Sequence, residues 1–183
     1  IEIAEKYLGK GVCAIDLAGD ECKYPVSDYK ELFEEAKKRN IPFTIHAGEV
    51  GSYESVLEAI KFGAKRIGHG IRSIDDMDTI NELKKHKVFL EVCPDSNLDT
   101  KAVYSIGDHP IRGLVDLGVN VTISTDNRTV SNTSLDNEYN LLIITIFHNT
   151  ALRRSRASAK TWRGRATFRR INPCPPGPNI SPS

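Results

Sequence analysis

The chain has 183 residues and a formal net charge of +1, a length that suits one domain or part of a larger one. No apolar run approaches the ~20 residues that a membrane-spanning helix needs, which argues against a membrane-embedded protein. The four cysteines show neither metal-binding nor redox spacing. We therefore expect a reduced, cytoplasmic protein without a signal peptide and without a membrane or nucleic-acid partner. The sequence leaves the oligomeric state open.

Charge and proline are unevenly distributed along the chain. All 24 Asp and Glu residues lie at or before Glu138, eight of the 25 Lys and Arg residues follow it, and five of the nine prolines lie between Pro173 and Pro182. One interpretation of this basic segment is an arm that binds nucleic acid or a membrane surface. The abrupt change favours the other interpretation, a disordered or non-native tail at residues 144–183 after a folded part at residues 1–143.

Apolar runs rich in β-branched residues alternate with amphipathic stretches after an opening helix that ends at Gly9. The predicted strands cover residues 12–18, 43–47, 66–69, 88–93 and 119–125. The predicted helices cover residues 28–40, 52–62, 75–86 and 109–117, and a further helix starts at Ser134. In the helix at 75–86 we expect Met77, Ile80 and Leu83 to face the core. Because the chain opens within a helix, we also expect a truncated protein.

Strands that are each followed by a helix predict an α/β fold with parallel pairing and right-handed crossovers. Both an open doubly wound sheet and a (β/α)₈ TIM barrel fit this pattern. Polar residues at or just past the strand ends decide between them: Asp16, His46, His69, Ser96, Asn97 and Asp126. A barrel brings such ends together at one mouth, whereas an open sheet concentrates its chemistry at one switch point. We therefore expect a partial TIM barrel, about five of its eight βα units.

The segment from His46 to Glu49 carries a possible metal ligand and a possible proton donor. A neutral imidazole at a strand end can hold a divalent metal. Gly48 permits a sharp turn, so Glu49 can point back over the same mouth, where a carboxyl group that does not bind the metal is suited to proton transfer. Taken alone, a histidine at a strand end is more often structural.

Three further segments have both a chemical and a structural interpretation. The glycines on either side of His69 allow close approach of a ligand, although a buried histidine in a tight turn would look the same. Asp126 can be a carboxylate ligand, or it can cap a helix or close an Asx turn. Gly19 offers a backbone N–H, or forms a plain turn. Ligand-type residues at four successive strand ends favour a hydrolytic metal centre over these separate structural roles.

In this order the motifs resemble those of the adenosine deaminase family, and the resemblance covers about residues 1–143. The segments that carry it are Asp16-Leu-Ala-Gly-Asp-Glu, His46-Ala-Gly-Glu, Gly68-His-Gly, Cys93-Pro-Asp-Ser-Asn, His109-Pro and Ser124-Thr-Asp-Asn. The resemblance implies a TIM barrel with one Zn²⁺ per complete site. It also implies that His46 and Asp126 are zinc ligands.

The same resemblance implies roles for four other residues. Glu49 would protonate the purine ring nitrogen beside the attacked carbon, and His69 would orient the attacking water and assist its deprotonation. Gly19 would donate its backbone N–H to another ring nitrogen, and Asn127 would contact the five-membered ring. Family members usually have Asp where this chain has Asn127; an amide can donate a hydrogen bond to a purine nitrogen, which a carboxylate can do only when protonated.

The expected activity is zinc-dependent hydrolytic deamination of adenosine and 2′-deoxyadenosine to inosine and ammonia in purine salvage, with adenosine as the small-molecule partner. One alternative within the same superfamily is deamination of free adenine. The other is a catalytically inert fragment. The family's first strand ends in His-x-His, which supplies two more zinc ligands, and these 183 residues contain no such motif.

Overall fold

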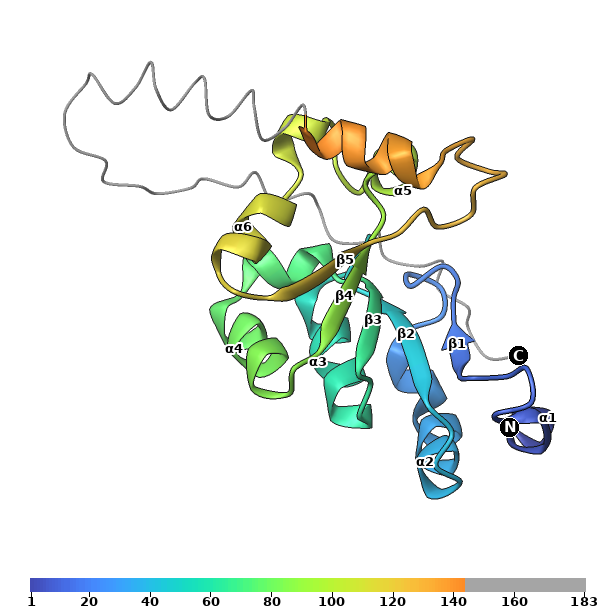
Figure 1. The fold of residues 1–183 in the computed structure, drawn as a ribbon. Coiled ribbons are helices and arrows are strands. Elements are labelled where there is room, and N and C mark those ends of the chain that lie inside the picture. Colours follow the sequence, from blue (N-terminus) through green and yellow to red (C-terminus); the bar gives the residue numbers. More distant parts are fainter. Residues whose placement is uncertain (144–183) are drawn as a thin grey trace, which may run out of the picture.

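The computed structural model describes residues 1–143, which form a five-stranded parallel sheet (Figure 1). The strands are β1 (Ile15–Leu17), β2 (Phe43–Ala47), β3 (Arg66–His69), β4 (Phe89–Val92) and β5 (Asn120–Ile123). They pair strictly in chain order, with no reversal of the kind that defines a doubly wound sheet. The predicted α/β fold with five parallel βα units of a barrel is thereby confirmed. The tail predicted at residues 144–183 lies outside the described residues.

Helices alternate with the strands along the chain, beginning with one helix before β1. They are α1 (Glu2–Tyr7), α2 (Lys30–Lys38), α3 (Tyr53–Phe62), α4 (Met77–Lys85), α5 (Pro94–Asp99) and α6 (Ile111–Asp116), with 3₁₀ turns at Val26–Tyr29, Ile71–Asp75 and Ile106–Asp108. Residues 135–143 form a further helix. In Figure 1, α2, α3, α4 and α6 lie beside the sheet, whereas α5 lies beyond the ends of the central strands. None of the helices in residues 1–143 is long and apolar enough to cross a membrane.

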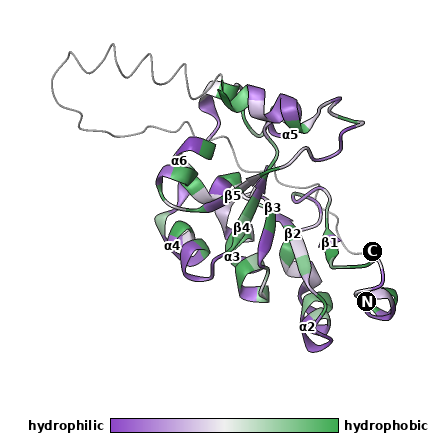
Figure 2. Cartoon of the chain, viewed as in Figure 1, coloured by the Kyte–Doolittle hydropathy of each residue, from purple (hydrophilic) through white to green (hydrophobic). Residues whose placement is uncertain are grey.

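A continuous apolar core lies between the sheet and these helices. Ile45, Ile67 and Leu90 on the three central strands are fully buried, and Val56 of α3 and Leu83 of α4 close over them. Figure 2 shows the resulting mixture of hydrophobic and hydrophilic residues on α2, α3 and α4, as expected for amphipathic helices that bury one face. This packing holds the strand ends in fixed positions relative to one another.

The prediction that Met77 faces the core is wrong, because its side chain is 54% exposed, whereas Ile80 and Leu83 are buried as expected. The helix starts at Met77, with the carboxylate of Asp76 accepting a hydrogen bond from the backbone N–H of Thr79 (2.8 Å). A spacing of three residues falls short of one 3.6-residue turn, so successive positions drift around the helix. Met77, at the start of the helix, therefore lies outside the apolar face that Ile80 and Leu83 form.

The turn after β3 depends on Gly70, whose backbone adopts the left-handed region at φ 66°. A Cβ atom there would lie 2.5 Å from a methyl carbon of the buried Leu90, a distance that real contacts do not allow. The absence of a side chain at position 70 therefore leaves the space that Leu90 occupies beneath the turn after His69.

We predict that Gly70→Ala lowers the free energy of unfolding by about 1–3 kcal/mol, the usual cost of overpacking a core, because the new methyl group must displace Leu90. The matched control is Gly107→Ala, where the added Cβ would meet only the hydroxyl of Ser105 at 3.7 Å. Urea denaturation of both variants measures the difference. Equal stability of the two variants would contradict this account of the turn.

Candidate active site

His46 and His69 come together because β2 and β3 pair in parallel register, with Ala47 opposite His69 and His46 opposite Gly68. Their ring centroids lie 5.0 Å apart in an edge-to-face arrangement. A Cβ atom on Gly68 would lie only 2.9 Å from the His46 ring, so the glycine provides the space that the ring occupies. His69 itself has φ 61°, an unfavourable backbone conformation of the kind that clusters at functional sites.

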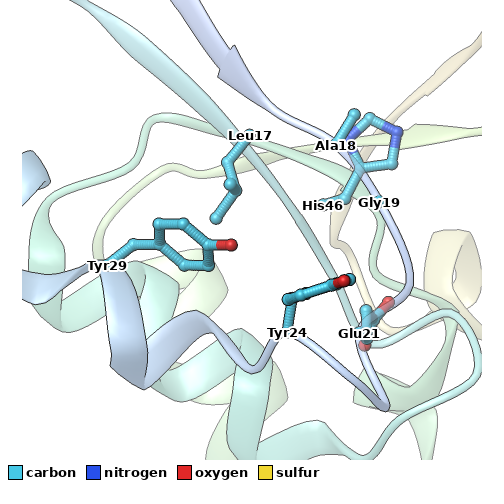
Figure 3. Close-up of a pocket in the computed structure, with 7 residues that line it drawn as sticks. All are labelled: Leu17, Ala18, Gly19, Glu21, Tyr24, Tyr29 and His46. Carbon is cyan, nitrogen blue, oxygen red and sulfur yellow. The ribbon is translucent and has the colours of Figure 1, made fainter.

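The His46 imidazole lies at the wall of a pocket with about 300 Å³ of empty space. Figure 3 shows this pocket, with the ring of His46 beside the loop that contains Gly19 and the rings of Tyr24 and Tyr29 on the other side. Nδ1 of His46 is 3.4 Å from Oδ1 of Asp16 but has no hydrogen-bond partner within residues 1–143. Burial lowers the pKa of His46, but the Asp16 carboxylate and more distant acids outweigh it and raise the pKa overall.

The Glu49 carboxyl group is largely buried, with 14% of its side chain exposed. Its Oε1 accepts hydrogen bonds from Nδ2 of Asn97 (2.8 Å) and Oγ1 of Thr100 (3.0 Å). Burial raises the pKa of Glu49, and these two hydrogen bonds only partly oppose the shift. The carboxyl group is therefore better able to hold a proton near neutral pH than an exposed glutamate is.

The turn that carries Glu49 is fixed by another carboxylate, that of Glu21 in the loop after β1. Its two oxygens accept hydrogen bonds from the backbone N–H groups of Gly48 (2.9 Å) and Glu49 (2.8 Å). Gly48 has φ 68°, and a Cβ atom there would lie 2.5 Å from Val56. The loops after β1 and β2 are thus tied together directly behind the Glu49 side chain.

His69 lies between two carboxyl groups. Its Nδ1 is 3.5 Å from Oε1 of Glu49, and its Nε2 is 3.9 Å from Oδ2 of Asp126. Burial lowers the pKa of His69 to about 4, and the nearby His46 acts in the same direction. The imidazole is therefore neutral at pH 7 and can orient a polar partner without carrying a charge.

Asp126 and Asn127 follow β5 and occupy different environments. Asp126 has φ 51°, and its Oδ2 accepts a hydrogen bond from Oγ of Ser96 (2.7 Å). Oδ1 of Asn127 accepts from the backbone N–H groups of Thr129 and Val130, both at 3.1 Å, which closes an Asx turn. The Asn127 amide oxygen is thus engaged in the turn, which leaves the N–H₂ group as the part that can donate to a ligand.

The described residues do not assemble a complete metal site by themselves. Within residues 1–143 no group of three or more His, Cys, Asp and Glu side chains is arranged to hold a metal ion. The Asp16 carboxylate lies 3.4 Å from Nδ1 of His46 without a formed hydrogen bond, on the side of the ring where the carboxylate partner of a histidine ligand is usually found. Histidine and aspartate are both residue types that zinc accepts as ligands, so His46 and Asp126 suit such a site chemically.

The sequence places Ser96 and Asn97 just past a strand end but does not reveal the contacts that they make. Both lie on α5, which is not among the predicted helices. Proline is favoured at the first position of a helix, as it is here, and that was the available signal. No sequence pattern pointed to the role of Glu21. The structure brings Glu49, His69 and Asp126 together, with Gly19 and Asn127 in loops that follow β1 and β5.

Polar and ionisable residues at the carboxyl ends of parallel strands paired in chain order are the arrangement expected for part of a TIM barrel with its active site at the mouth. A family model described as adenosine deaminase matches residues 1–159. The chain belongs to the adenosine deaminase family, and the resemblance drawn from its motifs is confirmed.

Individual relatives agree with this assignment. The chain is 45% identical over 144 residues to an adenosine deaminase of Clostridium kluyveri, with 78% of this chain and 41% of the relative covered. It is 47% identical over 143 residues to an adenosine deaminase of Haemophilus ducreyi, covering 76% and 42%. Its fold is similar to the crystal structure of an adenine deaminase from Arthrobacter aurescens, with a TM-score of 0.72, 29% identity and coverage of 79% and 45%. The chain therefore spans less than half the length of these relatives.

Proposed function

We propose that the full-length protein catalyses zinc-dependent hydrolytic deamination of adenosine and 2′-deoxyadenosine to inosine and ammonia, in purine salvage. The observation that carries the proposal is the buried Glu49 carboxyl group, held 3.5 Å from His69 at the mouth where His46 and Asp126 also lie. If Glu49 and His69 had only separate structural roles, there would be no reason to bury an acid with a raised pKa beside a neutral histidine. The 45–47% identity to two adenosine deaminases supports the choice of substrate.

His46 and Asp126 would hold the zinc ion, together with further ligands that residues 1–143 do not supply. Zinc, when bound, lowers the pKa of a water molecule to about 7 and so makes hydroxide available at neutral pH. The Asp16 carboxylate lies 3.4 Å from Nδ1 of His46, and the hydroxyl of Ser96 orients Asp126 by a hydrogen bond.

Glu49 is the residue suited to move a proton to the substrate. Because burial raises its pKa, the carboxyl group can carry a proton to the purine ring nitrogen beside the carbon that loses its amine. Addition at that carbon interrupts the aromatic ring, and protonation of the neighbouring nitrogen lowers the cost of the addition. The amine also needs a proton to leave as ammonia, and the attacking water is the source of that proton. Asn97 and Thr100 keep the carboxyl oxygen in place while this happens.

The remaining residues would orient the reactants. His69, neutral and buried, can hydrogen-bond the attacking water and hold it in place. The backbone N–H of Gly19 lies at the rim of the His46 pocket, where it can donate to a second ring nitrogen. The free amide N–H₂ group of Asn127 can donate to the five-membered ring.

Adenine deamination is the second candidate, because the adenine deaminase from Arthrobacter aurescens shares the fold at 29% identity. The higher identity to adenosine deaminases favours the nucleoside over the free base. A catalytically inert fragment is the third, because this chain contributes only two ligand-type residues to the metal. Measurements of zinc content and of the turnover of adenosine and of adenine on the same preparation distinguish these three possibilities.

We predict that Glu49→Gln in the full-length protein retains zinc but lowers turnover of adenosine by a factor of at least ~10², the usual contribution of a positioned general acid. The amide keeps the size of the side chain and removes its proton. Glu82→Gln on the exposed surface of α4 is the matched control and should leave turnover unchanged. The ultraviolet change from adenosine to inosine provides the rate, and near-normal turnover of Glu49→Gln would exclude it as the acid.

Asp126 and Asn127 are adjacent, yet we predict that their replacement by alanine affects zinc binding and catalysis differently. Asp126→Ala should lose zinc and activity together, because it removes a metal ligand. Asn127→Ala should retain zinc and weaken transition-state binding by about 1–3 kcal/mol, the cost of one unmade buried hydrogen bond. Elemental analysis of dialysed protein and kcat/KM separate the two effects. Equal loss of zinc in both variants would be incompatible with the assigned roles.

A further inference from the structure

The amide of Asn97 is fully buried and lies at the centre of a chain of side-chain contacts that the proposed reaction does not yet explain. Its Nδ2 is 2.8 Å from Oε1 of Glu49 and 3.1 Å from Nδ1 of His69. Its Oδ1 is 3.2 Å from Nε2 of His109, another buried histidine. One amide thus joins the proposed acid, the proposed water-orienting histidine and a histidine with no assigned role.

The direction of these hydrogen bonds follows from a single fixed donor, the backbone N–H of Ile111. It donates to Nδ1 of His109 (3.1 Å), and a backbone N–H can only donate. Nδ1 of His109 therefore carries a lone pair, and a neutral His109 must carry its proton on Nε2. Burial lowers the pKa of His109 to about 4, which keeps the ring neutral at pH 7.

Each of the remaining hydrogen bonds in the chain then has only one possible direction. Nε2–H of His109 donates to the amide oxygen of Asn97, so the N–H₂ group faces Glu49 and His69. Its two hydrogens are donated to Oε1 of Glu49 and Nδ1 of His69. Nδ1 of His69 is consequently an acceptor, and the proton of the neutral ring lies on Nε2, the nitrogen 3.9 Å from Asp126.

We propose that His109 and Asn97 form a hydrogen-bond relay that sets His69 in its Nε2–H tautomer and holds the Glu49 carboxyl group. His109 and Asn97 are thus positioning residues for the reaction. The consequence is that His69 presents an N–H group to the mouth in the resting protein. It can donate a hydrogen bond to an oxygen there, and it accepts a proton only if the relay is disrupted. The kinetic part of this inference rests on the proposed deaminase function; the tautomer itself does not.

The test is nitrogen-15 NMR of the zinc-loaded full-length protein labelled at histidine, which distinguishes protonated from unprotonated ring nitrogens. We expect His69 of the unaltered protein to be protonated at Nε2 only. In Asn97→Asp, a carboxylate faces Nδ1 of His69, so we expect that nitrogen to gain a proton. Turnover should fall at least ~10²-fold with KM changed by no more than a few-fold, as wrong-tautomer substitutions do elsewhere.

A second pair of variants applies if Asn97→Asp does not fold. His109→Phe fills the buried space without a donor, and we expect a mixture of His69 tautomers and reduced turnover. His109→Gln places an amide N–H₂ near the position of Nε2, and it should restore the single tautomer and most of the lost turnover.

A His69 protonated at Nδ1 in the unaltered protein, or a His69 tautomer that is the same in all variants, would overturn the relay. An unaltered protein with the expected tautomer and no deaminase activity would instead overturn the proposed function and leave the relay standing.

Discussion

The parallel register of the central strands is the constraint on which the whole site depends. Because Ala47 pairs with His69, the chain leaves β2 and β3 at the same level and in the same direction. β4 and β5 continue this pattern, with Val92 opposite Ile123, so the segments after both strands emerge beside the first two. The side chains at this mouth come from strand ends and from the loops that follow them, yet their positions are fixed by main-chain pairing and by the core beneath it.

Burial then gives the acid and the histidine their different chemical properties. The same loss of water raises the pKa of Glu49 and lowers that of His69, because in both cases it disfavours the charged form. His69 is therefore neutral at pH 7 and can orient a partner, whereas Glu49 holds a proton more readily than an exposed glutamate does. Asn97 makes hydrogen bonds to both and keeps this low-polarity arrangement from leaving buried polar atoms unpaired.

Much of the fold could be predicted because strand periodicity and helix boundaries are local properties. The limits of β2 and β3 match the prediction, whereas β1 is shortened from residues 12–18 to Ile15–Leu17. The convergence of His46, His69 and Asp126 followed from their places at strand ends. The supporting contacts could not be predicted, because the bonds of Glu21 to the turn at Gly48 and of Ser96 to Asp126 join residues about 30 positions apart.

The most direct test of the central claim is anomalous diffraction at the zinc absorption edge from crystals of the full-length protein. The account predicts a single zinc ion bound by His46 and Asp126, with Glu49 and His69 close to it but outside its coordination shell. A zinc ion bound elsewhere, or one that has Glu49 among its ligands, would contradict the assignment of this mouth as the active site.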